Sequence, residues 1–267
     1  MLSSRALVGL RVQRAVAHVL FPLLGPLIVL AMWIWGYRIE KKAEIRRRFR
    51  EMTRGYDGPL LICSNHMTKV DSAFIACAMS SNWSYMIRFH RFPWNIPEWK
   101  NFYQSLGLRL ICYLAKCVPI VREGTTEQKR ESLAKLEYVL GRGETVAIFP
   151  EGGRSRTGKL DMENFGYGTG QLWERVPGVR VICVYMRGYT QDSYTATPVR
   201  GERMFADIQQ VDVQTEHSGR RAARDVTRQI MNALHELEGR YYAQLASTPD
   251  NSDEINECSD ETEDRSA

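Results

Sequence analysis

His66 and Asp71 lie five positions apart in a short polar stretch that follows an apolar run. A neutral imidazole can accept a proton near pH 7, and a nearby carboxylate can fix its tautomer and stabilise the imidazolium that forms. On a continuous helix, five positions place two side chains roughly 140° apart. The two groups therefore meet only if the chain turns between them, for instance just before a helix that begins near Asp71. We take this pair as the candidate for general-base chemistry.

A second stretch, from Phe149 to Lys159, follows the apolar run 145–149 and combines adjacent glycines with three cations. Gly152 and Gly153 let the backbone approach a ligand closely, and arginine offers a planar set of donors to phosphate. The stretch therefore predicts an oxyanion-binding loop at the end of a buried strand. A plain strand-to-helix turn with a solvated basic rim is the alternative.

Together the two stretches resemble the glycerolipid acyltransferase family. His66 and Asp71 match its His-x-x-x-x-Asp signature, and Asn65 before them is also in place. The segment 149–152 matches its Phe-Pro-Glu-Gly block. Arg154 and Ser155 follow that block, as they do in the family.

Two further blocks of the family are matched more loosely. The segment 118–122 ends in Arg122 after apolar residues, without the usual glycine and phenylalanine, and the apolar segment 179–185 fits a fourth block in outline. The order and spacing of all four blocks over residues 58–187 agree with the family.

The resemblance implies acyl transfer from acyl-CoA or acyl-carrier protein to the free hydroxyl of 1-acylglycerol 3-phosphate. His66 would be the general base and Asp71 its orienting partner, with no acylated residue, no metal and no cofactor beyond the donor. Other residues would bind substrate, with Arg122 and Arg154 on the acceptor phosphate; this set consists of Asn65, Arg122, Glu151, Gly152, Gly153, Arg154 and Ser155.

Gly153 departs from the lysophosphatidate-type pattern, in which many members have threonine. The run Gly-Gly-Arg-Ser-Arg-Thr-Gly at 152–158 is more similar to the block of glycerol-3-phosphate acyltransferases, although those enzymes are generally longer. We keep 1-acylglycerol 3-phosphate as the expected acceptor, and glycerol 3-phosphate or another lysolipid as the alternative.

Two function classes outside acyl transfer compete with this interpretation. A membrane protein that only binds lipid has no need of a base such as His66. A hydrolase would commonly carry a Gly-x-Ser-x-Gly nucleophile elbow, and the sequence has none. A thiol-release measurement with and without an acceptor separates the three classes.

The elements that must position these residues predict an α/β fold: a single acyltransferase domain with a central mixed sheet covered by helices. We expect strands near 59–64, 84–89, 117–122, 145–149 and 179–186, and helices near 71–80, 97–107, 126–140 and 164–175. After Arg187 two further strands are expected before Val213, and then an amphipathic helix over 218–246.

Residues 19–37 carry no charge and would span about 28 Å as a helix, close to the hydrocarbon thickness of a bilayer. Pro22 and Pro26 would kink such a helix, so a hairpin or an obliquely embedded anchor is an alternative to a clean span. Trp33, Trp35 and Tyr37 are typical of a membrane interface. The sequence therefore predicts a membrane partner for the chain.

Seven cations follow the apolar segment and only three precede it, which predicts a catalytic domain on the cytoplasmic side. The seven could also bind anionic headgroups, and a basic run beside an uncharged segment fits lipid better than nucleic acid. They are Arg38, Lys41, Lys42, Arg46, Arg47, Arg48 and Arg50.

We divide the chain into an anchor with its basic segment at 1–57, an acyltransferase-like domain at 58–247 and a tail at 248–267. The tail holds eight acidic residues and one arginine. So polar a segment cannot bury enough apolar surface to offset the entropy of ordering, and we expect it to be disordered.

Overall fold

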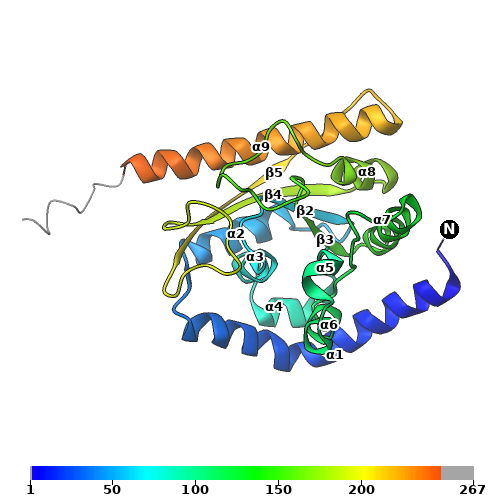
Figure 1. Ribbon diagram of the computed structural model, residues 1–267, viewed down its shortest axis with the longest axis horizontal. Coiled ribbons are helices and arrows are strands. Elements are labelled where there is room, and N and C mark those ends of the chain that lie inside the picture. Colours follow the sequence, from blue (N-terminus) through cyan, green and yellow to red (C-terminus); the bar gives the residue numbers. More distant parts are fainter. Residues whose placement is uncertain (1, 248–267) are drawn as a thin grey trace, which may run out of the picture.

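The structure is a computed structural model that describes residues 2–247; the predicted disordered tail lies outside this range. Within it, five strands form one mixed sheet in the order β1-β5-β4-β2-β3 (Figure 1). The strands are β1 (Arg38–Ile39), β2 (Leu60–Ser64), β3 (Thr145–Ile148), β4 (Arg180–Gly188) and β5 (Arg203–Val211). The predicted α/β class with a mixed sheet is confirmed.

β2 is the central strand that brings the two sequence motifs together. It pairs in parallel with β3, with Cys63 opposite Ile148, and in parallel with β4, with Cys63 opposite Cys183. The carboxyl ends of β2 and β3 therefore lie side by side. The chain leaves them at Asn65 and Phe149, so two segments eighty residues apart begin at the same edge of the sheet, where open α/β sheets usually bind ligands.

Alternate residues of the central strands pack into two different cores, as the period of a strand requires. Leu61 and Val181 face one core, which is covered by α7 (Thr126–Gly141), α8 (Gly168–Arg175) and α9 (Gly219–Ser247). Leu60 and Ile182 face the other core, which is covered by α2 (Lys42–Met52) and α3 (Asp71–Met79). The central strands are thus buried on both faces, which explains why β2 and β4 contain apolar runs without alternation.

The apolar N-terminal segment belongs to α1 (Ser4–Ile34), a helix longer than the uncharged stretch, with Pro22 and Pro26 inside it. By length and composition it is the one helix of the described chain that could cross a membrane. It lies along the edge of the domain opposite α9 (Figure 1). One stripe of it is buried against the domain, at Leu10, Gln13, Ala17, Phe21 and Gly25.

A buried ion pair ties the first half of α1 to the domain. Lys116 is fully buried, and its ammonium donates to Glu144 Oε2 at 2.6 Å and to the Phe92 carbonyl at 2.6 Å. Arg14 of α1 donates to the other oxygen of Glu144. Burial lowers the pKa of Lys116 to about 8, although Glu144 opposes this effect. Two cations on one carboxylate therefore join the helix to the core.

The strand predicted at 84–89 is wrong, because this segment forms α4 (Asn82–Ile87) and the short 3-10 turn η1 (Phe89–Arg91). Ser81 caps α4 by accepting from the Ser84 N–H. Tyr85 is buried against aromatic rings of α1 and η1, and its hydroxyl donates to the Ala76 carbonyl at 3.0 Å. Packing against α1 therefore outweighs the strand preference of single aromatic residues.

The strand predicted at 117–122 is reduced to isolated bridges, Asn95 with Cys117 and Glu98 with Ile120. Lys116 has a left-handed φ of 54°, and Pro119 has no N–H to donate, so a continuous ladder cannot form. The helix predicted at 97–107 is split into α5 (Trp99–Phe102) and α6 (Leu106–Leu114). Ser105 accounts for the break, because it caps α6 through the Leu108 N–H.

Only β5 follows β4 in the described chain, where two strands are predicted before Val213. Residues 189–202 form a loop instead, which we call the β4–β5 loop. The predicted helices at 71–80, 126–140, 164–175 and 218–246 are present as α3, α7, α8 and α9, within a few residues at each end. Thr125 and Gln128 form a capping box at the start of α7.

Several of the seven cations that follow the apolar segment bond to other groups of the protein, two of them in the domain at 58–247 and one within α2. Arg46 donates to the Cys77 carbonyl at 2.7 Å, Arg48 to Asp207 at 2.6 Å and Arg47 to Glu51 at 3.0 Å. The basic segment includes β1 and α2, and both pack on the sheet. At these three positions the arginine donates hydrogen bonds to other groups of the protein.

Candidate active site

His66 and Asp71 meet as the spacing predicts. The chain turns after β2, and α3 begins at Asp71, so that His66 Nδ1 lies 2.9 Å from Asp71 Oδ2. We assign the imidazole proton to Nδ1, because a carboxylate oxygen can only accept. Nε2 then carries the lone pair, and His66 lines the main cavity of the described chain.

Asp71 is held by the turn that it closes. Its Oδ2 accepts from the backbone N–H groups of Met67 at 2.7 Å and Thr68 at 2.8 Å, and its Oδ1 accepts from the Thr68 hydroxyl. Asp71 is only 7% exposed. A buried carboxylate with this many donors keeps one orientation, which fixes the imidazole in turn.

The loop after β3 packs against His66 from the other side. The Phe149 ring stacks on the imidazole with centroids 4.1 Å apart. The Glu151 carboxylate accepts from the His66 N–H at 3.0 Å, and the Ser155 N–H donates to the His66 carbonyl at 2.9 Å. Both motifs therefore form one unit around His66.

Glu151 has an unusual environment for a carboxyl group. Burial raises the pKa of Glu151 to about 7, and the backbone N–H groups of His66 and Asp161 oppose this only in part. The carboxylates of Glu238 and Asp161 raise it further. Glu151 therefore changes charge near neutral pH while it contacts the backbone of His66.

Asn65, Glu151 and Ser155 are not among the described residues that line the cavity. The Asn65 amide donates to the Met186 carbonyl and accepts from the Met186 N–H, both at 2.8 Å, which ties the end of β2 to β4. The Ser155 hydroxyl donates to the Lys159 carbonyl. The contacts of all three are with the protein, so they are placed to hold the motifs in position.

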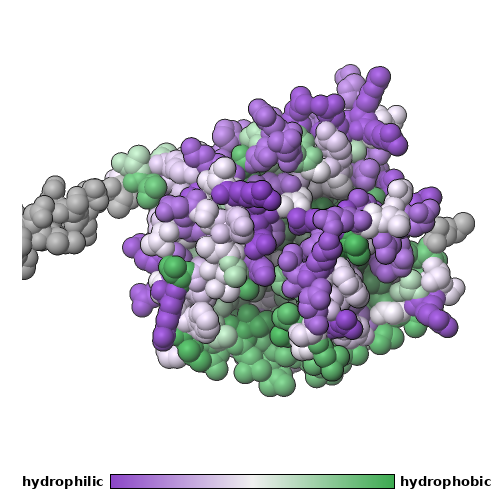
Figure 2. All heavy atoms as spheres, in the orientation of Figure 1, coloured by the Kyte–Doolittle hydropathy of each residue, from purple (hydrophilic) through white to green (hydrophobic). Residues whose placement is uncertain are grey.

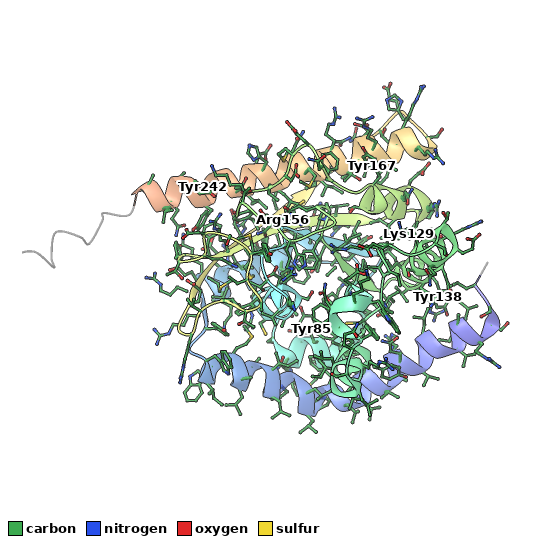
Figure 3. All side chains as sticks on the ribbon, in the orientation of Figure 1. Tyr85, Lys129, Tyr138, Arg156, Tyr167 and Tyr242 are labelled. Atoms are coloured by element: carbon green, nitrogen blue, oxygen red, sulfur yellow. The ribbon has the colours of Figure 1, made fainter. Side chains whose placement is uncertain are left out.

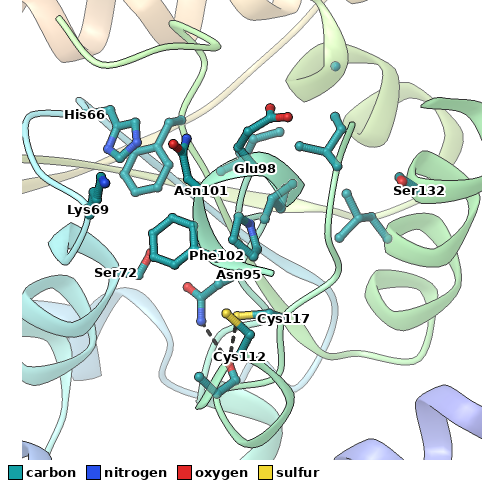
Figure 4. A pocket seen from close by; sticks show the side chains of 18 of the residues that line it. His66, Lys69, Ser72, Asn95, Glu98, Asn101, Phe102, Cys112, Cys117 and Ser132 are labelled. Atoms are coloured by element: carbon teal, nitrogen blue, oxygen red, sulfur yellow. Dashed lines mark hydrogen bonds between the residues drawn. The ribbon is translucent and has the colours of Figure 1, made fainter. Parts of the chain in front are cut away.

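The main cavity has a volume of about 1300 Å³. Figure 4 shows His66 at one side of it and Ser132 of α7 at the other, with Cys112 and Cys117 in its lower part. Residues from α1, α3, α4, α6, α7, α8 and the start of α9 line it. The cavity therefore extends from the edge of the domain covered by α1 to the edge covered by α8 and α9.

Arg122 lies beside the glycine loop, as its predicted role requires. Its Nε is 3.0 Å from Glu98 Oε2, and its side chain is about half exposed (47%). A Cβ at Gly153 would lie 3.6 Å from the Arg122 guanidinium. A side chain at position 153 would therefore contact Arg122, whereas glycine leaves this part of the cavity open.

Arg154 lies over the Tyr194 ring, 5.0 Å from its centroid, and both residues line the cavity. Tyr194 belongs to the β4–β5 loop, which is hydrogen-bonded to the turn between His66 and Asp71. The Thr195 N–H donates to the Met67 carbonyl, and the Lys69 N–H donates to the Ala196 carbonyl, both at 3.0 Å. The aromatic face can hold the guanidinium toward a ligand.

Glu98 and Tyr194 are site residues that the sequence analysis does not predict. Glu98 stands 24 positions before its partner Arg122, and Tyr194 stands 40 positions after Arg154, so no local spacing links either pair. Phe149 is part of the matched block, but the sequence gives no sign that its ring covers His66.

Comparison with known proteins agrees with this geometry. A family model described as Acyltransferase matches residues 37–187, which is more than half of the chain and includes both motifs, Arg122 and all but the last residue of β4. A search of curated proteins finds none that matches the chain. With the His66–Asp71 contact and the adjoining glycine loop inside the matched region, the chain belongs to the acyltransferase family, of the glycerolipid acyltransferase type.

Proposed function

We propose that this protein transfers a fatty acyl group from a thioester to the free hydroxyl of 1-acylglycerol 3-phosphate at a membrane surface, giving phosphatidate. The observation that carries the proposal is the His66 Nδ1–Asp71 Oδ2 contact of 2.9 Å at a cavity that arginines also line. The donor is acyl-CoA or acyl-carrier protein.

In this mechanism His66 Nε2 removes the proton from the acceptor hydroxyl as the oxygen attacks the thioester carbonyl. The tetrahedral intermediate collapses, the carbon–sulfur bond breaks, and the leaving thiolate takes the proton from the imidazolium. Asp71 holds the Nδ1–H and stabilises the positive charge on the ring. The stacked Phe149 ring keeps the imidazole facing the cavity.

The acceptor phosphate would lie on Arg154 and Arg122. In 1-acylglycerol 3-phosphate the hydroxyl and the phosphate are only a few bonds apart, so a phosphate group must bind close to the base. Arg154 is three residues after Glu151, which contacts the His66 backbone, and Arg122 adjoins Gly153. Two fixed cations suit a phosphate dianion.

Exposed apolar side chains support a membrane-bound protein. The hydrophobic surface in Figure 2 follows the edge along which α1 lies in Figure 1. It includes Val19, Leu23 and Trp33 of α1, and α4 and α6 extend it through Trp83, Ile87, Leu106 and Leu110. Because α1 is fixed to the domain from Leu10 to Gly25, we propose that it lies in one leaflet and does not cross the bilayer.

A thiol-release assay tests the proposed function. Purified protein in mixed micelles receives acyl-CoA or acyl-carrier protein, with and without 1-acylglycerol 3-phosphate. We expect release that depends on the acceptor, and loss of it in His66→Ala with unchanged circular dichroism. Release without an acceptor would identify a thioesterase, and release that His66→Ala retains would exclude His66 as the base.

Glycerol 3-phosphate is the second candidate acceptor. The specific observation in its favour is Gly153, which leaves the space beside Arg122 free of a side chain. A smaller, more polar acceptor could use that space. Direct competition between the two acceptors, with each radiolabelled product resolved by chromatography, decides between them.

A further inference from the structure

The cavity differs in character at its two ends. Toward α1, α4 and α6 it is lined by apolar side chains, among them Phe21, Ile28, Tyr85, Phe92 and Ile111. Toward α7, α8 and α9 it is lined by cations: Lys129, Arg130, Arg175 and Arg220. Lys129 and Tyr167 lie on the side of α7 and α8 in Figure 3, away from Tyr85 of α4.

Most of the cations at the basic end have no acidic partner. Arg175 pairs with Glu137, but Lys129, Arg130 and Arg220 form no ion pair within residues 2–247. Three uncompensated charges around one end of a cavity produce a positive potential there. Arg122 and Arg154 are separate from this group, because they adjoin the loop at His66.

The N-terminus of α8 opens onto the same end. Gly166, Gly168 and Thr169 all line the cavity, and a Cβ at Gly168 would meet open space. No side chain caps this helix, and among the described residues no acceptor is found for the N–H groups of Gly168 and Thr169. Free N–H groups at a helix start, together with the helix dipole, favour an anion.

The Thr169 hydroxyl is a second, independent sign of a ligand. Thr169 is 1% exposed, and its Oγ1 has no hydrogen-bond partner within the described chain. A buried hydroxyl without a partner is costly, so a group that bonds to it would stabilise the site. The neighbouring first-turn N–H, that of Gly170, is already bonded to Thr227 of α9 at 3.1 Å.

We propose that the N-terminus of α8, with Thr169, Lys129 and Arg220, binds the phosphate of the donor's phosphopantetheine arm. This inference rests on the proposed function. The acceptor phosphate must lie near His66, whereas a pantetheine arm separates the thioester carbon from its phosphate by many bonds. The donor's order of groups, acyl chain, thioester and phosphate, matches a cavity that is apolar at one end and basic at the other.

This assignment links the donor site directly to the catalytic loop. The Gly166 N–H donates to the Pro150 carbonyl at 2.9 Å, and Pro150 precedes Glu151, whose carboxylate accepts from the His66 N–H. The segment that leads into α8 is therefore hydrogen-bonded to the loop whose Glu151 contacts the His66 backbone. Acyl-CoA and acyl-carrier protein share this phosphate, so the site serves either donor.

The test compares S-acyl-phosphopantetheine with S-acyl-pantetheine, which lacks the phosphate. For Lys129→Gln/Arg220→Gln and for Thr169→Val, we expect KM for the phosphorylated donor to rise by about tenfold or more, since hydrogen bonds to a charged group are strong. KM for S-acyl-pantetheine and for the lysophosphatidate acceptor should stay unchanged. An equal rise for both donors, or a rise for the acceptor, would overturn the assignment.

A control pair on the same two helices is Lys135→Gln/Arg228→Gln. It removes the same charge, but neither residue lines the cavity, so KM for every donor should remain that of the parent protein. Acyl-CoA and acyl-carrier protein are assayed as separate arms, and the arm with the greater catalytic efficiency identifies the source of the phosphate. Thermal unfolding of each variant confirms that it folds.

Calorimetric binding of free CoA separates this inference from the proposed function. If the protein shows no acyl transfer but binds CoA, and the Lys129→Gln/Arg220→Gln variant binds it at least about tenfold more weakly, the phosphate site stands and the reaction is wrong. If acyl transfer occurs and both variants bind CoA as the parent protein does, the reaction stands and the site at α8 is wrong.

Discussion

At the scale of single residues, Asp71 serves two purposes. It caps the turn between β2 and α3 through the N–H groups of Met67 and Thr68, and it orients His66. A neutral amide at this position can keep the first purpose, because one oxygen can accept both N–H groups. It cannot keep the second in full, because it carries no charge to stabilise an imidazolium.

We therefore predict that Asp71→Asn lowers kcat by about 10²- to 10⁴-fold, the usual contribution of positioned acid-base catalysis. KM for the acceptor should change little, because Asp71 lies behind the imidazole. Steady-state kinetics beside a thermal unfolding curve measure both effects. Near-normal kcat in a folded variant would show that the charge of Asp71 is not needed.

The Glu151 carboxyl gives a second prediction at this scale, for stability against pH. Its pKa is about 7 in the folded protein against 4.5 ordinarily, so the folded state binds more protons than the unfolded state between these values. The free energy of unfolding should therefore fall as pH rises from 4.5 to 7, on the order of 3 kcal/mol, and then level off.

Glu151→Gln removes this ionisation, so the free energy of unfolding of the variant should fall less steeply with pH between 4.5 and 7. Urea unfolding in micelles, measured for both proteins at several pH values from 4.5 to 8, gives the difference directly. Parallel stability profiles for the two proteins would contradict the raised pKa.

At the scale of elements, Arg187 near the end of β4 holds two loops together. Its guanidinium donates to the Gly158 and Gln191 carbonyls and to the Tyr242 hydroxyl of α9. Gly158 belongs to the loop that carries Arg154, and Gln191 belongs to the β4–β5 loop that carries Tyr194. The contact between Arg154 and Tyr194 therefore depends on a buried arginine outside the cavity.

We predict that Arg187→Lys loosens both loops but leaves the sheet intact, since the single nitrogen of an ammonium does not span the positions from which the planar guanidinium fork donates to its three partners. Hydrogen exchange should become faster over residues 152–160 and 189–197 and stay unchanged in β2 and β3. KM for the acceptor should also rise in this variant, because the loops carry Arg154 and Tyr194. If exchange in the two loops is unaffected, Arg187 does not hold them.

The elements also show what a sequence can predict here. The His66–Asp71 contact follows from local geometry, because a strand end, a turn and a helix start lie within ten residues. The contact of Arg154 with Tyr194 depends on a loop without periodicity. The helix α4 depends on α1, whose aromatic packing against Tyr85 cannot be inferred from the segment 84–89 alone. Local patterns predict local contacts, and distant packing decides the rest.

At the scale of the whole molecule, apolar and hydrophilic surfaces are separated (Figure 2). The exposed apolar residues of α1, α4 and α6 form one edge, and α9 lies along the other (Figures 1 and 2). The cavity reaches from the first edge, near Phe21 and Ile28, toward the second. Under the proposed function, a lipid acceptor would enter from the bilayer at the apolar edge and a water-soluble donor from the opposite side.

We predict that Trp83→Glu/Leu106→Glu weakens binding to phospholipid vesicles. The two side chains are 69% and 84% exposed, and burying a side chain of this size in lipid is worth about 1.5–3 kcal/mol, or roughly tenfold or more each. Leu245→Glu on α9 serves as the control. Co-sedimentation that falls equally in all variants would show that this edge is not the membrane surface.

The attachment of α1 has a practical consequence for anyone who wants this enzyme free of detergent. Cutting the chain before β1 would remove Arg14 from Glu144 and expose the buried rings of Tyr85 and Phe92, so the shortened protein would lose part of its core together with the apolar helix. A water-soluble form is better sought by substituting polar residues for the exposed Val19, Leu23 and Trp33, while the buried positions of α1 are kept unchanged.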